Sequence, residues 1–85
     1  MQIIYSSKFG REYKKLTPEL KLSAKKKEKI FRKNPFHPAL ETHKLLGRLY
    51  PHWAFSISYS HRIIFEFASE KLIYFHSVGD HDIYK

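Results

Sequence analysis

The sequence predicts a single α+β domain in which an amino-terminal strand and a helical hairpin pack on a three- to four-stranded antiparallel sheet. Helical periodicity fills the first part of the chain and strand-like alternation fills the last part, which is the segregation typical of an α+β fold. Three strand-like segments follow one another at hairpin spacing, as antiparallel strands do. The length of 85 residues is enough for one domain with a modest core.

The amino-terminal part is expected to contain a short strand and two helices. Residues 2–5 are rich in β-forming side chains and are expected to add a strand to the later sheet. Ser6 or Ser7 can cap the first helix, and Thr17 followed by proline starts a second helix at residues 18–33. The two helices are expected to form a hairpin that covers one face of the sheet with its apolar stripe. The stripe residues are Phe9, Tyr13 and Leu16 in the first helix, and Leu20, Ala24, Lys27, Ile30 and Phe31 in the second.

The later strands are predicted at residues 52–59, 62–67 and 72–78. Large apolar residues occupy odd-numbered positions in the first two of them, so both strands can bury these side chains only if an odd number of residues joins them. A three-residue loop would place Ser58 opposite Arg62, on the face turned away from the helices. That face carries small side chains and one guanidinium, which suits a ligand site.

The connector at residues 34–51 has no clear period. Leu45 and Leu49 are expected to anchor it to the core, and Gly47 is expected to permit a turn. The connector is therefore predicted as a loop held down at two points.

The charge favours an anionic partner. Sixteen Lys and Arg residues against eight Asp and Glu leave a formal charge of +8, and such a surface attracts nucleic acid or acidic protein segments. Solubility alone needs a net charge of about 2–8 in magnitude, so it is the competing explanation. The lysine run at residues 25–27 has the same two interpretations, as a phosphate-binding patch or as a solvated helix face.

The composition also excludes several classes of protein. The chain contains no cysteine, which excludes disulfides and thiolate chemistry and agrees with a reducing cytoplasm. No apolar stretch reaches the roughly 18 residues of a membrane span, and the amino terminus lacks the features of a signal peptide. We therefore expect a soluble cytoplasmic protein that starts at Met1 and has no membrane partner.

The chain contains six histidines, and histidine is the residue type that most readily gains or loses a proton near neutral pH. A metal site would need close spacings, such as i, i+2 on a strand, and the histidines have none of them, so no metal site is expected. Metal-free cleavage of RNA by its own 2′-hydroxyl needs a base, an acid and a cation, which imidazole and guanidinium supply, and an aromatic ring can stack on an unpaired base. The six histidines are His37, His43, His52, His61, His76 and His81.

Four short motifs together resemble a known family. They are His43-x-Leu45-x-Gly47, Trp53-Ala54-Phe55-x-Ile57, His61-Arg62-Ile63-Ile64-Phe65 and Val78-Gly79-x-His81-Asp82-x-Tyr84. In this order and spacing they are similar to the RelE/ParE superfamily of bacterial toxins, and more narrowly to its YoeB/YafQ-like mRNA interferase branch. The resemblance covers nearly the whole chain and implies a RelE-like, microbial-RNase-like fold.

The resemblance also implies an activity and its residues. The implied activity is cleavage of translated mRNA on the ribosome, without a metal or other cofactor, by a toxin that a cognate antitoxin protein neutralises. By position, His43 corresponds to the family's upstream acid/base residue and Arg62 to its phosphate-binding arginine. His81 corresponds to the family's carboxyl-terminal histidine, and Tyr84 to the terminal aromatic residue that orients the phosphate or stacks on the substrate. Further RNA contacts are expected from Lys44, Arg48, His61 and Lys85.

Each of these assignments has an alternative. His43 could cap a loop, Arg62 could form a surface ion pair with Glu66, and His81 could belong to a frayed terminus. The main alternative function is a non-catalytic ParE-like toxin that inhibits DNA gyrase, although the gyrase poisons generally lack the His/Arg/His set. The third is a basic RNA-binding module without catalysis.

Overall fold

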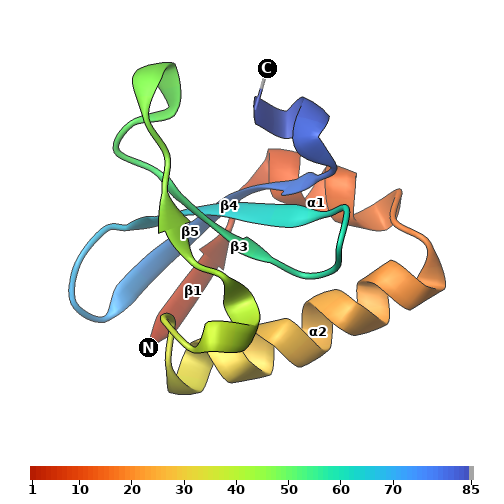
Figure 1. Cartoon of the computed structure of the whole chain (residues 1–85), viewed down its shortest axis with the longest axis horizontal. Helices are drawn as coiled ribbons and strands as arrows, with labels where there is room; N and C mark the ends of the chain where they lie inside the picture. The colour runs from red at the N-terminus through yellow and green to blue at the C-terminus, as the bar shows by residue number, and fades with distance from the viewer. Residues whose placement is uncertain (85) are drawn as a thin grey trace.

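The chain folds into a five-stranded mixed sheet with both α-helices packed on one face (Figure 1). The computed structural model describes residues 1–84, except for the side chains of His81 and Tyr84. The α-helices and strands are β1 (Gln2–Tyr5), α1 (Ser7–Lys14), α2 (Pro18–Lys33), β2 (His43–Lys44), β3 (Trp53–Ser56), β4 (Arg62–Phe67) and β5 (Leu72–Gly79). Three short 3-10 helices are η1 (Pro38–Leu40), η2 (Gly47–Leu49) and η3 (His81–Tyr84).

The sheet confirms the predicted α+β fold class, but it has five strands and is mixed, where three or four antiparallel strands were expected. Its strand order is β1-β5-β4-β3-β2, in which β1 runs parallel to β5 and every other pair is antiparallel. The parallel pair arises because both helices lie between β1 and the rest of the sheet along the chain, and parallel neighbours need such a crossover. β2 extends the sheet beyond the predicted strands; its two residues are too few to show any alternation.

Both α-helices begin at the predicted caps. Ser6 Oγ accepts a hydrogen bond from Phe9 N at 2.9 Å, and Thr17 Oγ1 accepts one from Leu20 N at 3.2 Å. Ser6 Oγ also donates to the His76 carbonyl at 2.8 Å, where β5 continues past the end of β1. The Ser6 side chain therefore fixes the start of α1 and also gives the His76 carbonyl a hydrogen bond where β5 no longer pairs with β1.

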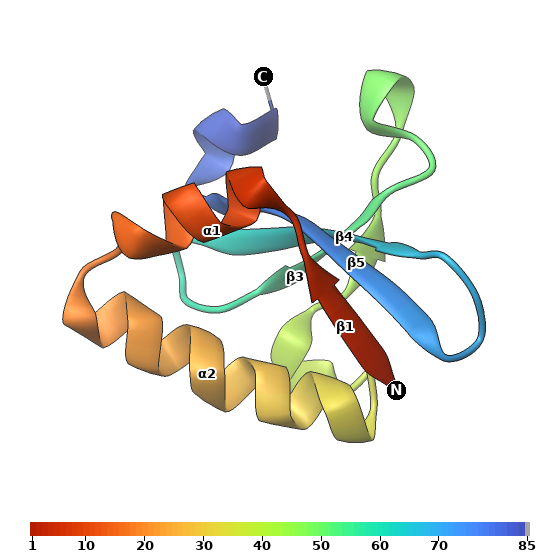
Figure 2. The same ribbon diagram turned by 180° about the vertical axis from the view of Figure 1, so that it is seen from behind.

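The core is an aromatic cluster between α2 and the sheet. Phe31 from α2 is fully buried and stacks on Phe55 at 4.8 Å between ring centroids. Its ring meets Phe65 edge-on at 4.9 Å and Phe75 edge-on at 5.5 Å. Because these three partners lie on β3, β4 and β5, one helix residue holds α2 against the centre of the sheet. Figure 2 shows α2 running across this side of the molecule.

A second, smaller cluster covers part of the opposite face. It contains Leu45, Ala54 and Ile64, with Leu49 and Ile83 packed against it. The two leucines are thus anchors of the connector, as predicted, and the predicted turn is present, since Gly47 has φ of 71°. In both ribbon views, the connector near η2 and the carboxyl-terminal η3 stand on the side of the sheet away from α2 (Figures 1 and 2).

The predicted pairing of β3 with β4 is right in parity and wrong in register. Odd-numbered residues do pair, with Phe55 opposite Ile63, but Arg62 lies opposite Ser56 and not Ser58. β3 is shorter than the strand predicted at residues 52–59, because the chain turns earlier. In this turn, Ile57 N donates to the His61 carbonyl at 3.1 Å. Tyr59, expected to face the helices, is instead fully exposed in this turn.

Candidate functional site

Arg62 and His43 lie on the face of the sheet opposite α2. Arg62 is the first residue of β4 and pairs with Ser56 on one side and Gly79 on the other. His43 in β2 pairs with Ala54, which belongs to the second cluster, so His43 shares that face. From strand spacing and rise, the Cα atoms of His43 and Arg62 are roughly 12 Å apart, a gap that the two side chains can span with a phosphate between them.

The guanidinium of Arg62 is anchored by the turn before it. Nη1 donates to the carbonyls of Ser58 at 3.0 Å, His61 at 3.1 Å and Tyr59 at 3.4 Å. The alternative ion pair with Glu66 is not formed, because the Glu66 carboxylate contacts His76 at 2.8 Å. All three contacts use the same nitrogen, so the guanidinium is held at one end by neutral carbonyls, which do not offset its positive charge.

His43 is exposed, and its ring orientation is set by its own loop. Nδ1 lies 3.0 Å from the Glu41 carbonyl oxygen. A carbonyl oxygen only accepts, so Nδ1 carries the hydrogen and Nε2 of the neutral ring is the nitrogen that can take a proton. The loop-capping interpretation of His43 is therefore correct for one nitrogen, and the other remains suited to acid/base chemistry.

Glu41 lies close to the same place and was not among the residues predicted from the sequence. Its Oε1 accepts a hydrogen bond from Ser56 Oγ at 3.2 Å, and Ser56 is the residue opposite Arg62. Glu41 adopts a left-handed backbone conformation with φ of 52°. Its position two residues before His43 was the available signal, but a lone acidic residue in an irregular connector has no pattern that would mark it.

The carboxyl-terminal η3 lies on the Arg62 side of the sheet. Ile83 in η3 packs on the second cluster, and a Cβ added to Gly79 would come within 2.5 Å of Ile83 Cγ2. Gly79 thus permits η3 to lie directly against the strand end that pairs with Arg62. The predicted His81 and Tyr84 side chains, and Lys85, lie outside the part of the chain that the structure describes.

The other predicted RNA-binding residues are divided between several environments. Lys44 pairs with Trp53, on the face away from His43, and its Nζ lies 4.9 Å from the centre of the Tyr50 ring. Arg48 and His43 line a hollow of about 270 Å³ together with three leucines. His61 is half-buried, with Nδ1 2.7 Å from Ser60 Oγ. The structure therefore places Arg48 near His43 and puts Lys44 elsewhere.

Among the described residues, one group has the composition of a metal site. His52, Glu66 and His76 each offer a ligand atom, and these atoms lie within 4.8 Å of one another. The expectation of no metal site used spacing along the sequence, which does not detect residues that pair across strands.

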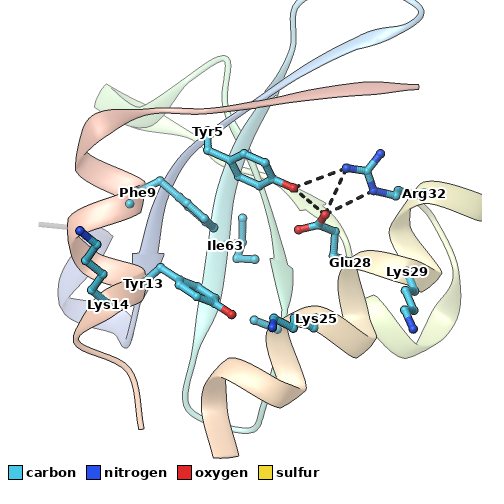
Figure 3. Close-up of a pocket in the computed structure, with 11 residues that line it drawn as sticks. Tyr5, Phe9, Tyr13, Lys14, Lys25, Glu28, Lys29, Arg32 and Ile63 are labelled. Atoms are coloured by element: carbon cyan, nitrogen blue, oxygen red, sulfur yellow. Dashed lines mark hydrogen bonds and ion pairs between the residues drawn. The ribbon is translucent and has the colours of Figure 1, made fainter. Parts of the chain in front are cut away.

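A larger groove lies on the helix side, where α1 and α2 diverge (Figure 3). It has a volume of about 690 Å³, compared with about 320 Å³ or less for the hollows on the opposite face. Ile63, which faces the helices, lies in its wall. Aromatic residues from β1 and α1 form one side, namely Tyr5, Phe9 and Tyr13, and basic residues surround it, namely Lys14, Lys25, Lys29 and Arg32. This groove is thus separated by the sheet from the predicted catalytic residues.

The acidic residue of the groove is already neutralised. Tyr5 Oη donates to Glu28 Oε2 at 2.6 Å, and Arg32 donates to the same oxygen at 3.2 Å (Figure 3). Burial raises the pKa of Tyr5, and the hydrogen bond to Glu28 raises it further. The hydrogen bond to Tyr5 raises the pKa of Arg32. Since Glu28 is paired in this way, the three lysines make the entrance to the groove strongly positive.

The fold is the one found in RelE/ParE-type toxins. YafQ from E. coli strain BL21(DE3) superposes with a TM-score of 0.81 at 17% identity, over 98% of this chain and 96% of that one. A YoeB/ParE toxin from Agrobacterium tumefaciens has a TM-score of 0.79 at 14% identity, over 95% and 99% of the two chains. The YoeB–YefM complex from Staphylococcus aureus gives 0.77 at 18% identity, over 95% and 97%.

The RelE-like fold that the sequence motifs imply is confirmed by this similarity to YafQ and YoeB toxins. No protein-family model matches the sequence, and no curated protein sequence matches it. At these identities the likeness establishes the fold. Within the described residues, no helix is both long and apolar enough to cross a bilayer.

Proposed function

We propose that this protein is the toxin of a toxin–antitoxin pair and that it acts as an endoribonuclease on translated mRNA. The observation that carries the proposal is the placement of His43, Arg62 and the backbone of η3 on one face of a sheet with the toxin fold. These three elements lie far apart along the chain and meet only through the strand order. The positive charge of the chain supports an RNA substrate. The same holds for the lack of an ion pair between Arg62 and any acidic side chain that the structure describes.

The proposed reaction is attack of the 2′-hydroxyl on the adjacent phosphorus. The O2′–P bond forms, the P–O5′ bond breaks, and the products are a 2′,3′-cyclic phosphate and a free 5′-hydroxyl. His43 and His81 supply the base for the 2′-hydroxyl and the acid for the leaving oxygen. The fixed guanidinium of Arg62 stabilises the charge that develops on the phosphorane, and Tyr84 orients the phosphate or stacks on the substrate. No metal or other cofactor takes part.

Docking to the ribosome and mRNA would use the basic surface. Arg48 and His61 lie on or beside the His43–Arg62 face, and Lys85 follows η3 in sequence. Lys44, on the other side of β2, would extend the contact along the sheet edge. Such contacts to phosphate are sequence-independent and weaken steeply with salt.

A test separates the proposed function from its alternatives. In a translation reaction, wild-type protein should truncate mRNA at mapped positions, and Arg62→Ala and His81→Ala should each reduce cleavage by at least about 100-fold. Lys25→Ala in α2 is the control, because it also removes one positive charge but lies at the groove on the helix side of the sheet. Intact mRNA with inhibited DNA supercoiling would instead identify a gyrase inhibitor, and an mRNA mobility shift without cleavage would identify an RNA-binding module.

We infer that the groove between α1 and α2 binds the cognate antitoxin. Similar solved toxins are found in complexes, YafQ with DinJ in E. coli and YoeB with YefM in Staphylococcus aureus. The aromatic wall and the basic surroundings of the groove fit an amphipathic segment that carries apolar and acidic side chains. The partner would then be held on the face of the sheet opposite the proposed catalytic residues.

A further inference from the structure

We propose that His52, Glu66 and His76 form a binding site for one divalent transition-metal ion of the zinc class. Nothing in the proposed RNA chemistry uses these residues. Two imidazoles and one carboxylate are a ligand set that zinc takes in proteins, with the fourth position left to water or another ligand. The site lies on the face of the sheet away from α2.

The fold brings the three residues together across strands. His52 directly precedes β3, and continuing the β3–β4 register places it opposite Glu66. His76 lies in β5 where the register with β4 shifts, between the pairs Ile64–Ser77 and Phe65–Phe75. Because Phe75 faces the helices, strand alternation places His76 on the same face as Glu66. The extra residue at the bulge means that Ser77 also lies on this face, opposite Ile64.

The distances suit a tetrahedral ion after small side-chain movements. His76 Nε2 lies 2.8 Å from Glu66 Oε1, and His52 Nε2 lies 4.0 Å from the same oxygen. The two imidazole rings are 4.5 Å apart between centroids, at an angle of 65°. Zinc bonds of about 2.0–2.1 Å place tetrahedral ligand atoms roughly 3.3 Å apart, so rotations that move these atoms by on the order of 1 Å complete the site.

A second observation shows that His52 is preset as a ligand. Its Nδ1 lies 3.1 Å from the Leu49 carbonyl oxygen. Because the carbonyl only accepts, Nδ1 carries the hydrogen and Nε2, which faces Glu66, has the free lone pair. Metal-binding histidines in proteins nearly always donate their other N–H in this way, which fixes both the tautomer and the ring orientation.

The site can be reached from solvent. The side chains of His52, Glu66 and His76 are 29%, 35% and 34% exposed. The two histidines also line a hollow of about 320 Å³ that leaves room for a fourth ligand. In the absence of metal, the His76 N–H donates to the Glu66 carboxylate, and an ion would replace that hydrogen.

The site is separate from the proposed catalytic residues. Glu66 lies four positions after Arg62 in β4, which is about 13 Å along the strand. The metal proposal therefore does not depend on the proposed function, and each can fail alone.

The test is a calorimetric titration of chelator-treated, tag-free protein with ZnCl₂. We expect wild-type protein to bind one zinc ion and its melting temperature to rise, as for any ligand that binds only the folded state. His52→Gln, Glu66→Gln and His76→Gln should each weaken binding by at least about tenfold, and the His52→Gln/His76→Gln double variant should not bind. The controls His37→Gln and His43→Gln remove other histidines and should bind as wild type does.

A spectroscopic measurement guards against misfolded variants. Co²⁺ added to wild-type protein should give the visible absorption of a tetrahedral site, and Zn²⁺ should displace it. Each variant's far-ultraviolet circular dichroism is recorded without metal, so loss of binding is interpreted only in folded protein. The proposal is wrong if wild-type protein binds no zinc, or if the double variant binds it as tightly as wild type does.

Discussion

The sequence indicates that Arg62 is suited to binding phosphate, but it does not predict which groups the guanidinium contacts. Its motif predicted a phosphate-binding role, and the expected partner in the alternative was Glu66. The structure instead anchors Nη1 to three turn carbonyls, because the chain turns two residues earlier than expected. The carboxylate that was expected nearby is taken by His76. Contacts of this kind depend on the register of the two strands. Hydrophobic alternation predicts that odd-numbered residues pair with odd-numbered ones, but it does not predict which of them are opposite each other.

Replacing His43 is expected to change the rate of mRNA cleavage without changing the stability of the fold. We expect His43→Gln to lower mRNA cleavage by about 10²–10⁴-fold, the range of one general acid or base, because glutamine cannot carry a proton. The free energy of unfolding should change by less than about 0.5 kcal/mol, since His43 is exposed. Cleavage is followed by mapping mRNA ends, and stability by urea unfolding. His37→Gln, at an exposed position that caps η1, is the control, and equal cleavage by both variants would remove His43 from the mechanism.

Tyr5 gives a prediction at high pH. Its pKa is raised above the usual value of 10.0, first by burial and then by the hydrogen bond to Glu28. Because the pKa of Tyr5 is higher in the folded state than in the unfolded state, its contribution to the free energy of unfolding is fully present below the unfolded-state pKa. This contribution is lost as the pH rises through the folded-state pKa. We therefore expect Tyr5→Phe to lose stability less steeply than wild type above pH 10, in unfolding curves recorded across that range. The control Tyr59→Phe changes a fully exposed tyrosine and should keep the wild-type slope.

At the scale of elements, the sequence is most informative where a periodic pattern is long. α2 begins and ends where the cap, the proline and the apolar stripe place it, and β4 matches its predicted residues. β2 was missed because two residues have no period, and the bulge in β5 leaves no mark in the alternation. The metal group depends on how β4 pairs with both β3 and β5, so its residues could not be gathered from spacing alone.

Gly79 couples the last strand to η3. In Gly79→Ala the new methyl group would approach Ile83 Cγ2 to 2.5 Å, so either the Ile83 side chain must rotate or η3 must shift away from the sheet. We expect mRNA cleavage to fall by at least about tenfold, since misplacing a catalytic group by about 1 Å is costly, while the aromatic core remains folded. The double variant Gly79→Ala/Ile83→Ala removes the clash and should recover part of the activity. If the single variant cleaves mRNA as wild type does, the position of η3 does not matter for the reaction.

At the scale of the whole molecule, the sheet separates the two surfaces to which we assign functions. One face carries His43 and Arg62, and the other carries the helices and their groove. The charge of the chain was predicted from composition to attract either nucleic acid or an acidic protein. The structure offers a surface for each, because basic residues surround the groove and Arg48 lies near His43 on the opposite face. Composition could not decide between these partners because it does not assign charges to faces.

The groove allows a charge-reversal test of antitoxin binding. We expect Lys25→Glu/Lys29→Glu to weaken binding of the cognate antitoxin by at least about tenfold at low salt, because both lysines line the groove and would repel acidic side chains. The matched control is Lys26→Glu/Lys33→Glu, which makes the same change of net charge at exposed positions of α2 that do not line the groove. Calorimetry at low and high salt measures both pairs, and the difference between them should shrink as salt screens the charges. Equal weakening by the two pairs would mean that the antitoxin senses only the overall charge, and the groove would then not be its binding site.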